Sequence, residues 1–207
     1  MSENIGFGFD ENTKEGSPGK FIQITPETAI AEGRYIDKLE FVEGNNPYFK
    51  VTVKNAQGQT AQKFWFEPKK DEMYTKTDAD LKKKVTQFNG VMANLTRRFL
   101  GENYKPERVT TFESLCKIVI KDIGNKYEGK ELRIKCVYDK NGFPSLPNVA
   151  PIFEDLVTNP SKLIINPKYD NVISSYKPRN NDSTDAATEL TPDTDPLHKS
   201  DTKEANF

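Results

Sequence analysis

The sequence is poor in the side chains that most enzymes use for catalysis. Its 207 residues include one histidine, His198, and two cysteines, Cys116 and Cys136. A histidine-based triad or a zinc site needs several such side chains together, and the chain has no Gly-rich phosphate loop ending in GK[ST]. We therefore expect a protein that is not an enzyme and that binds neither a metal ion nor a cofactor.

Cysteine usage and missing targeting segments bear on the compartment. Each cysteine lies in an apolar pattern, which predicts two buried, reduced thiols, with a disulfide as the alternative. No apolar run approaches the roughly 18 residues of a membrane span. The first residues, MSENIGFGFDENTKEG, lack the basic start and apolar core of a signal peptide. These features favour a cytoplasmic protein with no membrane partner.

Charge is distributed unevenly along the chain, although the net charge is only -1. Residues 50–141 carry 20 basic and 12 acidic side chains, whereas residues 1–49 carry 4 and 9 and residues 175–207 carry 4 and 7. A polyanion responds to the local field rather than to the net charge. The basic middle therefore suits nucleic acid, and a soluble surface with lysine-rich helices is the alternative.

Alternating apolar residues bounded by turn signals predict several short strands. A Pro-rich stretch at 143–153 suits an extended edge strand, and Asn141-Gly142 is a strong turn signal. The predicted strands cover residues 20–24, 34–44, 48–54, 60–67 and 131–138.

Two helices are predicted between the fourth and fifth strands, as an insertion at about residues 77–122. Thr77 with Asp80 forms a capping box that starts the first helix, and Gly101 can end it. Thr111 or Thr110 caps the second. The first helix has one apolar stripe with steps of three and four residues, which consists of Leu81, Val85, Phe88, Met92, Leu95 and Phe99.

These elements predict a mainly β fold with inserted helices, an OB-like partly open five-stranded β-barrel. A β-sandwich or a small α+β sheet is the alternative. Residues 20–174 would form this domain, after a flexible N-terminal arm at 1–19. Residues 175–207 are rich in Asn, Asp, Ser, Thr and Pro, which predicts a disordered acidic tail.

Strand parity separates a core face from a ligand face, because successive side chains point to opposite sides. Phe49, Val51, Phe64, Phe66, Leu132 and Ile134 are assigned to the core. Aromatic and cationic residues are then left on the opposite faces: Tyr48, Lys50, Lys54, Lys63, Trp65, Arg133 and Lys135. Such a mixture suits single-stranded nucleic acid, since rings stack on bases and cations contact phosphates. Packing of Trp65 and Tyr48 under a helix or the arm is the alternative.

The run Lys82-Lys83-Lys84 lies largely off the apolar stripe of the first helix. Such runs are usually a solvated face. Phosphate contacts by Lys82 and Lys83 are the functional interpretation that we carry forward.

A basic β domain followed by an acidic tail that ends in Phe resembles the bacterial and bacteriophage single-stranded DNA-binding proteins. The resemblance implies an OB-fold that coats and protects single-stranded DNA during replication, recombination and repair, in a bacterial cell or a phage-infected host. It also implies that the tail recruits replication or recombination proteins, and a homodimer is possible. The tail residues implied in partner binding are Asp193, Asp195, Asp201, Glu204 and Phe207.

The tail departs from that family, because it has only a modest acidic excess and Lys199 and Lys203 interrupt it. Two other classes therefore stay open at this point. One is a non-enzymatic structural or virion-associated protein with a β domain. The other is a nuclease or recombination accessory enzyme whose scattered carboxylates bind a metal ion.

Overall fold

A computed structural model describes residues 20–71 and 74–173 of the chain. The proposed arm, and the proposed tail with its five candidate partner-binding residues, lie outside the described residues. The elements follow in chain order as β1 (Ile30–Val42), β2 (Tyr48–Asn55), β3 (Thr60–Phe66), α1 (Asp78–Leu100), α2 (Phe112–Ile123), β4 (Glu131–Lys135), β5 (Val137–Tyr138), β6 (Pro144–Ser145) and β7 (Phe153–Glu154).

The main sheet has five antiparallel strands in the order β3-β2-β1-β4-β7. The long strand β1 pairs with β2 and with β4, and its register shifts at two places, between Ala31 and Arg34 and between Ile36 and Lys38. Such irregularities bend a strand and increase its twist. β2 pairs with residues 34–42 of β1 and β4 pairs with residues 30–35, so the two partners overlap only at Arg34 and Tyr35.

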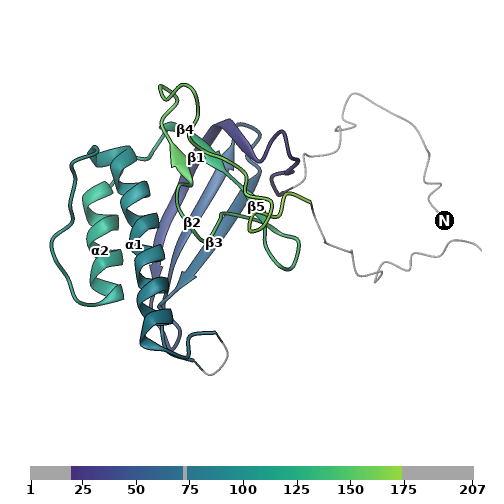
Figure 1. The fold of residues 1–207 in the computed structure, drawn as a ribbon. Helices are drawn as coiled ribbons and strands as arrows, with labels where there is room; N and C mark the ends of the chain where they lie inside the picture. The colour runs from purple at the N-terminus through teal and green to yellow at the C-terminus, as the bar shows by residue number, and fades with distance from the viewer. Residues whose placement is uncertain (1–19, 72–73, 174–207) are drawn as a thin grey trace, which may run out of the picture. The chain divides into compact units, whose positions relative to one another are not determined.

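The two helices lie beside each other along one flank of the sheet (Figure 1). The capping box at the start of α1 is formed as predicted, since the Thr77 hydroxyl accepts from the Asp80 amide at 3.1 Å and Asp80 accepts from the Thr77 amide at 3.0 Å. Thr111 caps α2. The apolar stripe of α1 packs toward the sheet through Phe88, whose ring centroid lies 6.4 Å from that of Phe49.

The core lies between the helices and the inner face of the sheet. Phe49, Val51 and Leu95 are fully buried in it. Cys116 and Cys136 are buried free thiols, as predicted, and burial raises their pKa values to about 12 and about 11. Both thiols therefore stay protonated and unreactive at neutral pH.

The prediction of a mainly β chain with inserted helices is confirmed, and within the described residues the sheet does not close into a barrel. The predicted strand at 20–24 is wrong, because Phe21 forms only an isolated bridge with Thr60. The predicted strand at 131–138 is interrupted at Cys136, whose amide donates to the carbonyl of Ala29. The turn at Asn141-Gly142 joins β5 to β6, as expected.

Arg133 and Lys135 point away from the apolar core, but the expectation that they are open to a ligand is wrong. Arg133 donates to Glu154 Oε2 at 2.6 Å and to the Thr158 carbonyl at 2.9 Å. Lys135 is buried and pairs with Asp170 Oδ2 at 2.9 Å. The chain that follows β4 folds back over this face, so both cations hold the fold together.

Removing Lys135 should be strongly destabilising. Lys135→Ala leaves the buried Asp170 carboxylate without its cation, which typically lowers the free energy of unfolding by about 3–5 kcal/mol. Urea denaturation measures the loss. Lys162→Ala, at an exposed lysine of the same segment, is the matched control and should change stability by less than about 0.5 kcal/mol. Equal stability of the two variants would contradict a structural role for the buried pair.

Candidate nucleic-acid interface

The pairing of β2 with β3 decides which side chains share the outer face of this part of the sheet. Tyr48 lies opposite Phe66, and Lys50 lies opposite Phe64. Directly opposed residues point to the same side of an antiparallel sheet. The two strands therefore bring Tyr48, Lys50, Phe64 and Phe66 onto one surface.

The predicted assignment of β3 is reversed in the structure. Phe64 and Phe66 were expected in the core, but 41% and 58% of their surface is exposed. Trp65 was expected outside, but only 7% of its surface is exposed. The run Phe64-Trp65-Phe66 is aromatic at all three positions, so alternation alone cannot orient it. The register does so, because Trp65 lies opposite the buried Phe49.

Three rings form a contiguous cluster on the outer face. The Tyr48 ring centroid lies 5.4 Å from that of Phe64 and 5.4 Å from that of Phe66, both in edge-on geometry. The Lys50 ammonium lies 5.7 Å from the centroid of Phe64. We call Tyr48, Phe64, Phe66 and Lys50 the aromatic face. It presents flat apolar rings beside a cation on two neighbouring strands.

A groove of about 700 Å³ adjoins this face along β3, and we call it the β3 groove. Its far wall is the β5–β6 hairpin, which is held to β3 by a 2.9 Å hydrogen bond from the Ser145 hydroxyl to the Gln62 carbonyl. Its aromatic and cationic lining consists of Phe21, Lys63, Phe64, Phe66, Tyr138, Lys140, Phe143 and Tyr169.

Lys63 is a half-buried cation of the β3 groove. Its ammonium lies 6.0 Å from the centroid of the Trp65 ring. It forms no hydrogen bond or ion pair with the described part of the chain. Burial lowers the pKa of Lys63 below its ordinary value, with Asp139 acting in the opposite direction. A half-buried cation that forms no close ion pair can contact an anion such as a phosphate, with Asp139 of the same groove supplying part of the countercharge.

The other predicted cations lie elsewhere. Lys54 is exposed at the end of β2 and pairs with Asp37 Oδ1 at 2.8 Å. Lys50 has a longer ion pair with Glu40, at 3.4 Å. Lys82 and Lys83 are exposed on α1, outside the groove. Of the predicted site residues, the structure thus places Tyr48 and Lys50 together on the outer face, and it places Lys63, which lies opposite Val51, in the adjoining groove.

Several groove residues were missed by the sequence analysis. Phe64 and Phe66 were seen but were placed in the core. Phe21 and Phe143 come from segments outside the regular strands, and their rings meet edge-on at 6.0 Å. No periodicity marks such residues. The only available signal was the presence of large aromatic side chains beside turn residues.

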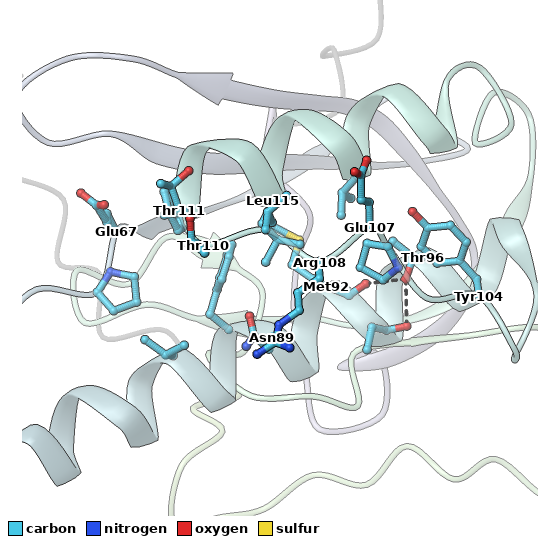
Figure 2. A pocket seen from close by; sticks show the side chains of 18 residues that line it. Glu67, Asn89, Met92, Thr96, Tyr104, Glu107, Arg108, Thr110, Thr111 and Leu115 are labelled. Atoms are coloured by element: carbon cyan, nitrogen blue, oxygen red, sulfur yellow. Dashed lines mark hydrogen bonds between the residues drawn. The ribbon is translucent and has the colours of Figure 1, made fainter.

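A second pocket, of about 650 Å³, lies between α1 and α2 (Figure 2). Its inner lining is apolar and includes Met92 and Leu115. At one side the Tyr104 hydroxyl donates to Asp122 at 2.5 Å, and burial followed by this hydrogen bond raises the pKa of Tyr104 to about 12. Its charged residues are Glu67, Glu107 and Arg108, so it lacks the positive surplus that a polyanion needs.

Metal sites, membrane spans and similarity to known proteins give no further indication of function. Within residues 20–71 and 74–173, no group of histidine, cysteine and acidic side chains is arranged to hold a metal ion. No helix in that part of the chain is long and apolar enough to cross a membrane. The chain matches no family model, no curated protein and no solved structure. A functional assignment must therefore rest on the surface itself.

The two neighbouring aromatics of β3 should differ sharply in their effect on stability. Trp65→Ala empties a core position and should lower the free energy of unfolding by about 3–5 kcal/mol. Phe66→Ala removes an exposed ring and should cost no more than about 1 kcal/mol. Urea denaturation of the two variants measures both values. A larger loss for Phe66→Ala than for Trp65→Ala would contradict the register.

Proposed function

We propose that this protein binds single-stranded DNA and that the aromatic face with the adjoining β3 groove is its binding surface. The observation that carries the proposal is the cluster on the outer face in which the Tyr48 ring contacts both Phe64 and Phe66 beside Lys50. Soluble proteins rarely leave contiguous aromatic surface exposed without a partner. The rings are available for stacking, and the nearby cations are available for phosphates.

The chemistry of the surface favours a single strand over a duplex. Stacking on an aromatic ring contributes roughly 1–3 kcal/mol per base and tolerates any sequence, because every base has a π-face. A duplex hides those faces within its own stack. Lys63 in the groove and Lys50 on the face would contact the phosphates between stacked bases. Coating and protection of single-stranded DNA during replication, recombination and repair follows from such sequence-tolerant binding.

The topology gives further support to an OB-like assignment. β1 is long and irregular and pairs with both β2 and β4. β5 follows β4 after a single residue, and its partner β6 lies against β3. The chain thus comes round from one end of the sheet toward the other, as in a partly open barrel. Nucleic acid lies across the outer face of such barrels in single-strand-binding proteins.

Partner recruitment by the acidic segment 175–207 and a possible homodimer remain part of the proposal, outside the described residues. An acidic segment tethered to a basic groove competes for it at high effective concentration. The structural-protein and nuclease alternatives gain no specific support from the described residues.

Loss of a ring from the aromatic face should weaken binding to oligo-dT. Phe66→Ala and Phe64→Ala should each lower the affinity by about 5- to 150-fold, the equivalent of one lost stacking contact. Fluorescence anisotropy of a labelled oligonucleotide measures the dissociation constant at several salt concentrations.

Val157→Ala, at an apolar residue that is 91% exposed and lies outside the groove, is the control and should bind like the wild type. Duplex DNA of the same length should bind more weakly than the single strand. Unchanged affinity in both folded phenylalanine variants would remove the aromatic face from the site. Absence of any complex with the wild type would overturn the function.

Lys63 should make binding pH-dependent. Its ammonium has a lowered pKa, so raising the pH removes its charge earlier than for an ordinary lysine, and affinity should fall through that range. Lys63→Gln should abolish this step and reduce the log-log salt slope by about 0.7. Lys63→Arg should keep the charge and lose the step. An identical pH profile in all three proteins would show that Lys63 does not contact the ligand.

A further inference from the structure

The chain between β3 and the second turn of α1 carries another surface with aromatic and cationic side chains. Four residues define it: Tyr74, Lys76, Lys82 and Lys83. All four are exposed. We call these residues the basic ridge. It begins a few residues after Phe66, which is the last residue of β3 and the most exposed ring of the aromatic face.

Hydrogen bonds with Asp71 hold the backbone at Tyr74 and Thr75. The Asp71 carboxylate accepts from the amide of Tyr74 and, at 3.1 Å, from the amide of Thr75. The Asp71 amide donates to the Thr75 carbonyl at 3.1 Å. Thr75 is fully buried and anchors the turn, whereas 77% of the neighbouring Tyr74 surface is exposed. The ring therefore stands in solvent on an anchored backbone.

The lysines of this region fall into two groups. Lys69, Lys70 and Lys84 pair with Glu67, Asp78 and Asp71, at 2.9, 2.7 and 3.6 Å. Lys76, Lys82 and Lys83 form no ion pair or hydrogen bond with any residue that the structure describes. The capping box at Thr77 and Asp80 fixes the start of α1 and with it the position of Lys82 and Lys83. Lys83 does lie near the Asp80 carboxylate, whose pKa is lowered chiefly by hydrogen bonds from Thr77 and further by Lys83 and Lys84. The ridge thus offers three lysines without a close ion pair.

The chain runs from the end of the aromatic face to the ridge around one end of the sheet. The Glu67 amide donates to the Pro47 carbonyl at 3.0 Å, which holds the start of the loop against the residue before Tyr48. Glu67 and Val85 line the same pocket, so the loop and the second turn of α1 lie close together. The loop after β3 leads to the start of α1 at one end of the sheet (Figure 1).

We propose that a single strand leaving the aromatic face at Phe66 continues onto the basic ridge, where one base stacks on Tyr74 and phosphates contact Lys76, Lys82 and Lys83. This inference rests on the proposed function and extends the same site. An exposed ring and exposed lysines without close ion pairs suit the bases and phosphates of unpaired nucleotides. The ridge therefore adds nucleotides to the length of DNA that the protein covers.

Oligonucleotides of two lengths separate the ridge from the aromatic face. Oligo-dT of about 4 and about 16 nucleotides spans the range of lengths that one OB-fold covers. The variant Tyr74→Ala/Lys76→Gln/Lys82→Gln/Lys83→Gln should bind the short strand like the wild type. It should bind the long strand at least about fivefold more weakly, and its log-log salt slope should fall by about 2.

A matched control removes three lysines from the opposite end of the helices. Lys105, Lys121 and Lys126 are exposed there, near the Tyr104–Asp122 contact. Lys105→Gln/Lys121→Gln/Lys126→Gln makes the same change in net charge and should leave binding of the long strand near the wild-type value. Equal weakening by this control and by the ridge variant would overturn the proposal, because the effect would then be one of overall charge.

Failure of the ridge is distinguishable from failure of the proposed function. If the ridge variant binds the long strand like the wild type, while Phe66→Ala weakens the short strand, the ridge is excluded and the aromatic face stands. Tyr74→Ala alone should weaken only the long strand. If the wild-type protein binds neither strand, both the ridge and the proposed function are overturned.

Discussion

The antiparallel register between β2 and β3 is the constraint on which the rest of the structure depends. It places Trp65 opposite Phe49, so both enter the core, where Phe88 of α1 packs against Phe49. The same register leaves Phe64 and Phe66 outside with Tyr48. A slip of one residue would exchange the two faces. Core packing and the exposed aromatic cluster are thus two consequences of one set of hydrogen bonds.

The basic middle of the chain is largely neutralised by its own folding. Arg133 and Lys135 bind the returning segment after β7, and Lys54, Lys69 and Lys70 pair with nearby carboxylates. Among the described residues, cations without an ion pair lie in the groove, on the basic ridge and also at the opposite end of the helices, where Lys105, Lys121 and Lys126 are exposed. Charge counted along the sequence therefore overstates how much of it a polyanion would meet. The fold selects which cations stay available.

The residues that stabilise this domain differ from those that form its exposed aromatic surface. The helices, Trp65 and the inner faces of the strands supply the buried apolar surface that drives folding. The outer rings contribute little to the core because much of their surface stays in water. The aromatic face can therefore change in composition without loss of the fold. The β5–β6 hairpin, which forms a hydrogen bond with β3, shapes the groove beside that face.

The sequence by itself determined the local elements. Alternation predicted β2, β3 and β4, helical spacing with Thr77 and Thr111 predicted α1 and α2, and turn chemistry at Asn141-Gly142 predicted the hairpin. It also placed Tyr48 and Lys50 on the same face of one strand, because the alternation of β2 has an unambiguous apolar side.

Only the tertiary structure decided which face of β3 is buried and which cations form ion pairs within the protein. Three consecutive aromatics give no alternation to interpret, so the orientation of Trp65 depends on its cross-strand partner. Arg133 and Lys135 are turned away from a ligand because they pair with Glu154 and Asp170, which lie 21 and 35 residues later in the chain. Register and long-range ion pairs are properties of segments that meet only on folding, and local patterns carry no record of them.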